Sequence, residues 1–365
     1  MKECGSVRHP PSVGPGTMQA IRRPAALVAT LVTIACGDSS GAGPEGPVEP
    51  LPDPIVWLPD VGVLVARAER SLFVSNIEAL AAFGDRTQGA GSNIAAAAWI
   101  DQQLTAFGYE VERHPYLYRG DPRESVFTTK VGAAEPDKMY IVSAHMDGRG
   151  GGGAADDDAS GSALVLEIAR VLAMTDVSTE RSVRFVFWNN EETGLNGSTA
   201  YVSDRAPLQG IEDPPSSGRY PEPSWLGMIQ HDMILFDHGL PPGPQQSATA
   251  DVDVEYQLAS AFADESQTLA GVLGQGNREF GVRYPAQVGS NMRNTDSWPF
   301  RNLVASVSVR ENQRVAEIGQ GANPHWHQPT DLFSTYDDAD FDLGFAALQT
   351  TLAAVAQLSG VRIAP

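Results

Sequence analysis

The sequence predicts an α/β fold in which a central sheet is covered by helices on both faces. Short apolar strands alternate along the chain with segments of helical periodicity, a pattern typical of such sheets. Polar clusters follow several of these strands directly, at the edge where open α/β sheets bind ligands. The chain has 365 residues, is 42% hydrophobic and shows no internal repeat. We therefore expect one folded domain with long loops over residues 61–365.

The helices are predicted from apolar residues that recur every three or four positions. The second of them stops at Gly108, because glycine commonly terminates helices. The last one is amphipathic and closes the domain. The expected helices span residues 63–83, 93–107, 162–173 and 341–358.

The strands are predicted from short apolar runs. Residues 139–144 and 183–188 are almost wholly apolar and suit buried strands, whereas residues 227–230 and 303–309 give weaker strand patterns. Two stretches rich in proline and polar residues interrupt this pattern, and we expect both to be surface loops. These loops span residues 207–223 and 240–247.

The composition narrows the possible partners and the possible chemistry. The chain has 25 basic and 45 acidic residues and a net charge of -20, which argues against nucleic acids and anionic membrane surfaces as partners. Its only cysteines, Cys4 and Cys36, both precede the predicted domain. A metal in that domain must therefore be held by histidines and carboxylates, a ligand set that favours catalytic over structural zinc.

The N-terminal residues 1–36 resemble an export signal. Arg22 and Arg23 precede an apolar run that ends at Cys36, and this run is too short to span a bilayer as a helix. The sequence around Cys36 is similar to a bacterial lipobox, with Met18 as the expected start of translation. We expect a protein of the bacterial cell envelope, anchored by a lipid on Cys36; the alternative is an ordinary secretory signal and a secreted product. Residues 37–60, rich in Gly and Pro, read as a tether.

Five polar segments carry the expected chemistry. His145 and Asp147 stand two apart at a strand end, so Asp147 can accept the imidazole N–H of His145 and fix its tautomer. Three consecutive acids begin at Asp156, an arrangement that is costly unless cations neutralise them. The adjacent acids Glu191 and Glu192 follow a buried strand, so one can bind metal while the other acts as a general base.

Asp232 and His327 complete a set of two histidines and three carboxylates that suits two zinc ions sharing one aspartate. Each segment alone has a simpler explanation, since His-x-Asp can be a surface pair and acidic runs are often helix caps. The order and context of all five segments together favour a metal site. The glycine-rich run 148–153 lacks the Lys and Ser/Thr of a phosphate-binding loop, so we expect a flexible loop over the site.

These segments resemble the M28 family of zinc aminopeptidases and related hydrolases. The matching stretches are HMD at His145, AADDDASG at Ala154, EETGLNGS at Glu191, HDM at His231 and HQPTD at His327. The resemblance extends over residues 70–358. It implies a three-layer αβα fold of the zinc-exopeptidase type, with a mixed, mostly parallel central sheet and a single catalytic domain.

The resemblance also implies roles for individual residues. Asp157 is the bridging ligand, His145 and Asp232 complete one zinc site, and Glu192 and His327 complete the other. Glu191 matches the general base, and Asp147 matches the acid that supports His145.

Two positions depart from the family pattern. Ser297 follows Asp296 where a histidine is usual, and Trp326 precedes His327 where some peptidases carry a tyrosine that stabilises the oxyanion. We expect Asp296 and Trp326 to contact the substrate. The Trp-His pair is also similar to glutaminyl cyclases, single-zinc relatives on the same fold.

The expected function is removal of amino acids from peptide N-termini by water activated at two zinc ions, with peptides as partners. The alternatives are a single-zinc glutaminyl cyclase, a carboxypeptidase-type member of the family, and a non-catalytic binding module. The chain contains neither Gly-x-Ser-x-Gly nor His-Glu-x-x-His, which disfavours serine hydrolases and zinc peptidases of the helical-motif class.

Overall fold

The structure is a computed structural model that describes residues 54–237, 252–289, 292–311 and 323–364. All of these described residues belong to one compact unit. The predicted signal with Cys36, most of the predicted tether and the predicted loop 240–247 lie outside the described residues.

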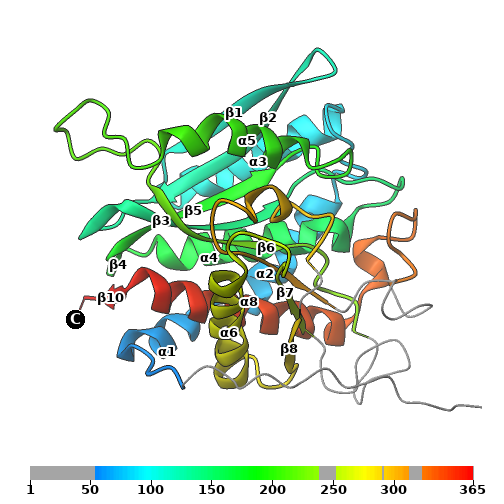
Figure 1. Cartoon of the computed structure of the whole chain (residues 1–365). Helices are drawn as coiled ribbons and strands as arrows, with labels where there is room; N and C mark the ends of the chain where they lie inside the picture. The colour runs from blue at the N-terminus through cyan, green and yellow to red at the C-terminus, as the bar shows by residue number, and fades with distance from the viewer. Residues whose placement is uncertain (1–53, 238–251, 290–291, 312–322, 365) are drawn as a thin grey trace, which may run out of the picture. The chain divides into compact units, whose positions relative to one another are not determined.

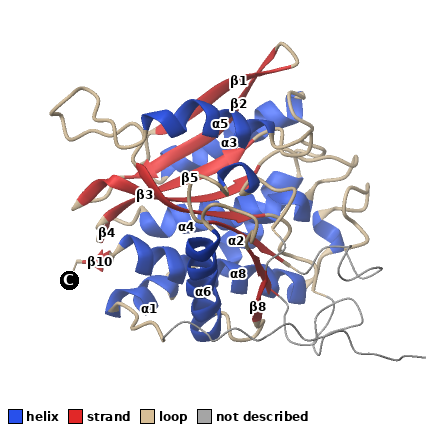
Figure 2. Ribbon diagram, viewed as in Figure 1, coloured by secondary structure: helices blue, strands red, loops and turns tan. Residues whose placement is uncertain are grey.

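A sheet of eight strands runs through the compact unit in the order β1-β2-β5-β3-β6-β9-β7-β8 (Figure 2). β5, β3, β6 and β9 are mutually parallel, while β1, β2 and β7 introduce antiparallel pairs. A two-stranded sheet pairs β4 (Val177–Thr179) with β10 (Val361–Ile363). The large sheet consists of β1 (Val111–Tyr118), β2 (Asp121–Lys130), β3 (Glu135–His145), β5 (Arg181–Trp188), β6 (Ser224–His231), β7 (Val252–Glu255), β8 (Ala286–Gly289) and β9 (Ser306–Arg310).

Helices cover both faces of this sheet. On one face α4 packs against β3 and β5, α8 lies beside α4, and α6 crosses α8 (Figure 1). On the other face α5 packs near β1 and β2. The helices are α1 (Pro59–Val65), α2 (Arg70–Ala81), α3 (Gly91–Ala106), α4 (Gly161–Leu172), α5 (Asn196–Arg205), α6 (Ala263–Phe280) and α8 (Asp338–Ser359).

Strand alternation divides the apolar side chains between two cores. In β5, Phe185 and Phe187 join the larger core with α2, α4 and α8, whereas Val186 and Trp188 face the smaller core with Tyr201 of α5. Because successive strand residues point to opposite faces, one apolar strand can serve both layers. The predicted α/β class, with a mixed and mostly parallel sheet between helices, is confirmed.

Most predicted elements are present, with shifted ends. The helix predicted over residues 63–83 is wrong as one element, because α1 ends at Val65 and α2 begins at Arg70. The amide of Glu69, at the start of α2, donates to the buried carboxylate of Glu167, which fixes the break. The predicted loop 207–223 is largely exposed and extends from the domain (Figure 1).

The closing helix α8 is long and apolar enough to cross a membrane by length and composition, and 72% of its most apolar stretch is buried inside the protein. The buried residues of α8 belong to the larger core, where they pack against α2, α4 and α6. These contacts give α8 the environment of a core helix.

The four parallel strands bring their carboxyl ends to one edge of the sheet. His145 at the end of β3 is in register with Trp188 at the end of β5, and His231 at the end of β6 is in register with Val309 of β9. Residues that follow these strands therefore gather at a single place, which is where open α/β sheets bind ligands.

Candidate metal centre

His145 presents one ring nitrogen to the sheet edge. Its Nδ1 lies 3.0 Å from the backbone carbonyl of Asp147, which makes Nδ1 the donor and leaves Nε2 as an acceptor. The residue is fully buried, and Nε2 makes no hydrogen bond among the described residues. A buried acceptor nitrogen with this orientation is the form in which histidine binds metal ions.

Asp157 lies between the two candidate histidines. Its Oδ1 is 3.1 Å from His145 Nε2, and its Oδ2 is 3.1 Å from His327 Nε2. The residue belongs to an irregular turn, Ala155–Ser160, that links β3 to α4. Asp157 therefore directs one oxygen towards each of two histidines from separate parts of the chain.

The neighbouring acids point elsewhere. Asp158 accepts hydrogen bonds from the amides of His145 at 3.0 Å and Gly161 at 2.8 Å, so it ties β3 to the start of α4. Asp156 accepts from the amides of Ile234 and Leu235, both at 2.9 Å. Asp158 Oδ2 also lies 4.0 Å from His145 Nε2, but of the three consecutive acids only Asp157 places an oxygen within 3.1 Å of each histidine ring.

Glu192 and His327 lie on the other side of Asp157. Glu192 Oε2 is 2.9 Å from His327 Nε2, and Glu192 Oε1 is buried without a hydrogen-bond partner among the described residues. His327 has a φ of 55°, a left-handed conformation that is uncommon for a residue with a side chain. A Cβ on Gly150 would come within 2.6 Å of the His327 carbonyl carbon, so only glycine fits there. The glycine-rich run thus packs against the backbone of His327.

Asp232 approaches His145 from β6. Its Oδ1 lies 3.9 Å from His145 Nε2, and its Oδ2 accepts a hydrogen bond from Arg310 Nη1 at 3.2 Å. Asp232 directly follows β6, and Arg310 is the last residue of β9. Because β6 and β9 are neighbouring parallel strands, these residues meet at the sheet edge although they are 78 positions apart.

The five predicted ligands form two groups that share Asp157. His145, Asp157 and Asp232 form one group, and Asp157, Glu192 and His327 form the other; in each, one ligand atom per residue lies within 4.8 Å of the others. Imidazole nitrogens and carboxylate oxygens suit zinc, and three protein ligands leave a position for a substrate or water. The unpartnered atoms of His145 and Glu192 lie within these groups, so the residues fit bound cations.

Asp147 connects the end of β3 to the pair of glutamates. Its two oxygens accept hydrogen bonds from the amides of Glu191 at 3.1 Å and Glu192 at 3.4 Å. The Nδ1 proton of His145 goes to the backbone carbonyl of Asp147, and the Asp147 carboxylate lies farther away, at 3.7 Å. The carboxylate therefore supports the turn that carries Glu191 and Glu192.

Burial dominates the electrostatics of this edge. It raises the pKa of Asp147 to about 6 and that of Glu192 to about 7, with the Asp157 charge adding to the shift of Glu192. Burial raises the pKa of Glu191 well above its usual range. Burial opposes protonation of His327, but the carboxylates of Asp157 and Glu192 raise its pKa to about 9. So many carboxylates around two histidines form a strong cation-binding field.

The two predicted substrate contacts lie in different environments. Asp296 is fully buried and accepts a hydrogen bond from Ser198, and burial raises its pKa to about 8. Trp326 is 45% exposed, and its ring lies over His327 with centroids 4.2 Å apart. Ser297, which replaces the usual histidine, bonds to Ser308 of β9 at 2.7 Å.

Three supporting residues have roles that the sequence did not reveal. Asp331 accepts hydrogen bonds from the amides of Asp156 at 2.9 Å and Asp157 at 3.2 Å, which holds the acidic turn. Arg86 is fully buried and donates to backbone carbonyls, including Met146 at 3.0 Å and Gly153 at 2.6 Å. Two of these residues did have a signal in the sequence. Arg310 is a charged residue directly after a predicted strand, and Asp331 is the last residue of the HQPTD segment.

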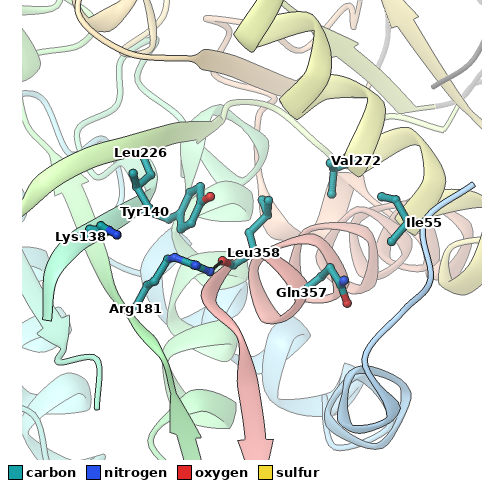
Figure 3. A pocket seen from close by; sticks show the side chains of 8 residues that line it. All are labelled: Ile55, Lys138, Tyr140, Arg181, Leu226, Val272, Gln357 and Leu358. Atoms are coloured by element: carbon teal, nitrogen blue, oxygen red, sulfur yellow. Dashed lines mark hydrogen bonds between the residues drawn. The ribbon is translucent and has the colours of Figure 1, made fainter. Parts of the chain in front are cut away.

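A cavity of about 550 Å³ lies away from this site. Its lining residues come from the amino-terminal halves of β3, β5 and β6, from α6, from the end of α8 and from Ile55, so it lies towards the opposite ends of the parallel strands (Figure 3). Its two cations, Lys138 and Arg181, both pair with Glu135. None of the described residues that line this cavity is a histidine or an acid.

Comparison with known proteins agrees with this geometry. The sequence model of Peptidase family M28 matches residues 126–349, more than half of the chain. The chain belongs to peptidase family M28. Members of this family are metal-dependent, which agrees with the two ligand groups, and the predicted resemblance and the predicted class of metallopeptidase are confirmed at the level of the family.

This M28 chain is similar to aminopeptidases and to a glutaminyl cyclase. It is 25% identical over 248 residues to the probable lipoprotein aminopeptidase LpqL of Mycobacterium tuberculosis, covering 64% of this chain and 46% of that protein. The LapA aminopeptidase of Legionella pneumophila has a TM-score of 0.63 at 17% identity, covering 82% of this chain and 74% of LapA. Porphyromonas gingivalis glutaminyl cyclase has a TM-score of 0.58 at 18% identity, covering 80% of this chain and 98% of the cyclase. Both structures share the fold of this chain.

The chain spans less than half the length of the curated relatives that it matches, between 13% and 46%. The family match over residues 126–349 contains all five candidate metal ligands and the whole of the glutamate pair.

Proposed function

We propose that this protein is an exported aminopeptidase that binds two zinc ions and hydrolyses peptides from their N-termini. The observation that carries the proposal is the position of Asp157, whose two oxygens each lie 3.1 Å from a different histidine. One shared carboxylate between two ligand groups is the arrangement that two-metal hydrolases use. The aminopeptidases among its relatives support the choice of reaction.

The five candidate ligands would hold two ions. His145 and Asp232 would hold one ion, Glu192 and His327 the other, and Asp157 both. When bound, zinc supplies Lewis-acid polarisation of a carbonyl and lowers the pKa of water.

Glu191 takes the proton from the attacking water and passes it to the leaving amine, as a general base and then a general acid. Asp147 fixes the backbone of Glu191 through the hydrogen bond to its amide, at 3.1 Å. Burial raises the pKa of Glu191, which makes its carboxylate a stronger base than a solvated one.

A second candidate is glutaminyl cyclisation, favoured by one observation. Trp326 lies over His327 at 4.2 Å between ring centroids and is 45% exposed, so it offers an aromatic surface at the mouth of the site. The chain also spans 98% of a glutaminyl cyclase with the same fold. Cyclisation needs no attacking water, so the two reactions differ in whether water is consumed.

Export is part of the proposal. The apolar run before Cys36 and the lipobox-like sequence support a lipid anchor in the bacterial cell envelope. A relative named as a probable lipoprotein aminopeptidase supports the same location. Peptides outside the cytoplasm would then be the substrates.

Kinetics with a substrate panel tests the function. The zinc-loaded protein should release p-nitroaniline from aminoacyl-p-nitroanilides and leave N-acetylated forms intact, because an aminopeptidase requires a free N-terminus. Cleavage of N-blocked peptides from the C-terminus would indicate a carboxypeptidase. Conversion of N-terminal glutamine to pyroglutamate without hydrolysis would indicate a cyclase, and no turnover of any substrate would favour a binding module.

A further inference from the structure

The cavity of about 550 Å³ towards the amino ends of the parallel strands is separate from the metal centre (Figure 3). Tyr140, which lines it, precedes His145 by five residues on β3, and five residues of a strand span roughly 17 Å. The volume of the cavity falls within the ~300–1,000 Å³ of small-molecule sites. Its lining therefore has to be explained apart from the metal ligands.

Four apolar side chains from four separate segments form much of the cavity wall. They are Ile55, Leu226 of β6, Val272 of α6 and Leu358 at the end of α8, and each is only half-buried. The amide of Ile55 donates to Gln275 Oε1 of α6 at 2.6 Å, which holds the segment before α1 against that helix. Half-buried apolar side chains that face one concave space favour a ligand with an apolar body.

One polar group of the cavity is available to a ligand. The Tyr140 hydroxyl makes no hydrogen bond with the described residues, and Figure 3 shows it pointing into the space between the labelled side chains. Its ring is fixed against Gly227 of β6, where an added Cβ would come within 3.1 Å of the ring. A phenol O–H held in this way can donate to an acceptor atom of a ligand.

Two cations on the same side of the cavity share one anion. Lys138 and Arg181 both pair with Glu135, so the three groups carry a net charge of +1. Arg181 Nη1 donates to the carbonyl of Leu358 at 3.0 Å, and Nη2 has no partner in the part of the chain that the structure describes. Figure 3 shows both cations on the side away from Val272 and Ile55. The charged side of the cavity therefore suits an anion, and the other side an apolar chain.

We propose that this cavity binds a small amphiphilic carboxylate, an apolar chain that ends in one carboxylate group. The carboxylate lies beside Lys138 and Arg181 and accepts a hydrogen bond from Tyr140. The chain packs against Ile55 and Val272. A single negative charge balances the net charge of the cation cluster, whereas a dianionic headgroup would leave one charge unbalanced. The proposal is independent of the proposed function, because it uses none of the metal ligands.

Calorimetric titration with decanoate, below its micellar concentration, tests the proposal. The protein is the full chain carrying Cys36→Ser, which takes no lipid and therefore needs no detergent. We expect one site per chain. Butyrate should bind at least about tenfold more weakly, because each methylene group that is buried adds to the affinity. Decyltrimethylammonium has the same chain length and a positive headgroup, and it should not compete with decanoate.

Substitutions around the cavity separate the contributions of charge and hydrogen bonding. Tyr140→Phe should weaken decanoate binding by about tenfold, because it removes a hydrogen bond to a charged group. Tyr118→Phe alters a half-buried tyrosine on β1, so it is the matched control and should leave binding unchanged. Glu135→Gln leaves both cations unpaired and should tighten binding by about fivefold. Lys138→Met should weaken binding by about the same factor, and Lys138→Arg should preserve it.

Three outcomes overturn the proposal. The first is that decanoate does not bind. The second is binding that Tyr140→Phe, Lys138→Met and Glu135→Gln all leave unchanged, because the carboxylate would then lie elsewhere, for example on a metal ion. The third is binding to vesicles of anionic phospholipid without binding of monomeric decanoate, because this face would then contact a membrane surface. A protein that binds decanoate as described but hydrolyses no peptide supports this proposal and contradicts the proposed function.

Discussion

Replacement of Asp331 by asparagine tests how the acidic turn is held. Asp331 is buried, and its oxygens accept from the amides of Asp156 and Asp157 and from the hydroxyl of Tyr336 at 3.0 Å. An asparagine has only one acceptor oxygen, so its NH₂ group must face one of the two amides. The variant loses one hydrogen bond to a charged group and leaves a buried N–H unpaired. We expect a loss of about 3–5 kcal/mol in the free energy of unfolding.

The assay for this variant is thermal unfolding of the metal-free protein, with metal content measured in parallel. The expected loss lowers the melting temperature by on the order of 10 °C for a domain of this size. Metal content should fall as well, because the backbone of Asp157 is no longer fixed. Asp338→Asn is the matched control, since that carboxylate is 95% exposed and should change stability little. An Asp331→Asn protein as stable as the wild type would refute the reasoning.

Three further predictions follow from the proposed chemistry and from burial. Glu191→Gln should keep its metal while turnover falls by about two orders of magnitude or more; full activity would remove Glu191 as the base. Burial lowers the pKa of His231 to about 4, so the unfolded state, with a pKa of about 6.5, takes up the proton first. Stability present above pH 6.5 is therefore lost as the pH falls towards 4, by roughly 2 kcal/mol at pH 5, and denaturant unfolding of His231→Gln should lack this loss. Labelling with a fatty-acid analogue should disappear in Cys36→Ser, and an unlabelled wild-type protein would favour an ordinary signal peptide.

The sequence was informative where short-range rules decide the outcome. The buried strands β3 and β5 were predicted from apolar runs because both faces of a parallel strand are covered. His145 and Glu192 could be placed at one edge because each follows such a strand. Predicting the position of these two residues required only the parallel arrangement of the sheet and no information about distant contacts.

Elements with weak local signals were missed. The helix α6 contains three glycines, which lower helix propensity, and it is stabilised by packing against α8. The hairpin of β1 and β2 is rich in charged and polar residues, and its register is fixed by pairing with β5. In both cases tertiary packing outweighs the local preference.

The long-range contacts of the site residues could not be predicted from the sequence either. The contact between Asp232 and Arg310 joins residues 78 positions apart, and that between Asp157 and Asp331 joins residues 174 apart. The glycine-rich run, predicted as a flexible loop over the site, packs against the backbone of His327, because Gly150 permits a close approach of two backbones. Such contacts follow from strand order and loop packing, which the local pattern does not specify.

Anomalous diffraction at the zinc edge, on crystals of the protein grown with excess zinc, tests the central claim most directly. The account predicts two peaks about 3.5–4 Å apart, one beside His145 and Asp232, the other beside Glu192 and His327, with Asp157 between them. A single peak beside Glu192 and His327 would contradict the two-ion proposal and favour the cyclase. Peaks located away from all five residues would contradict the assignment of the site.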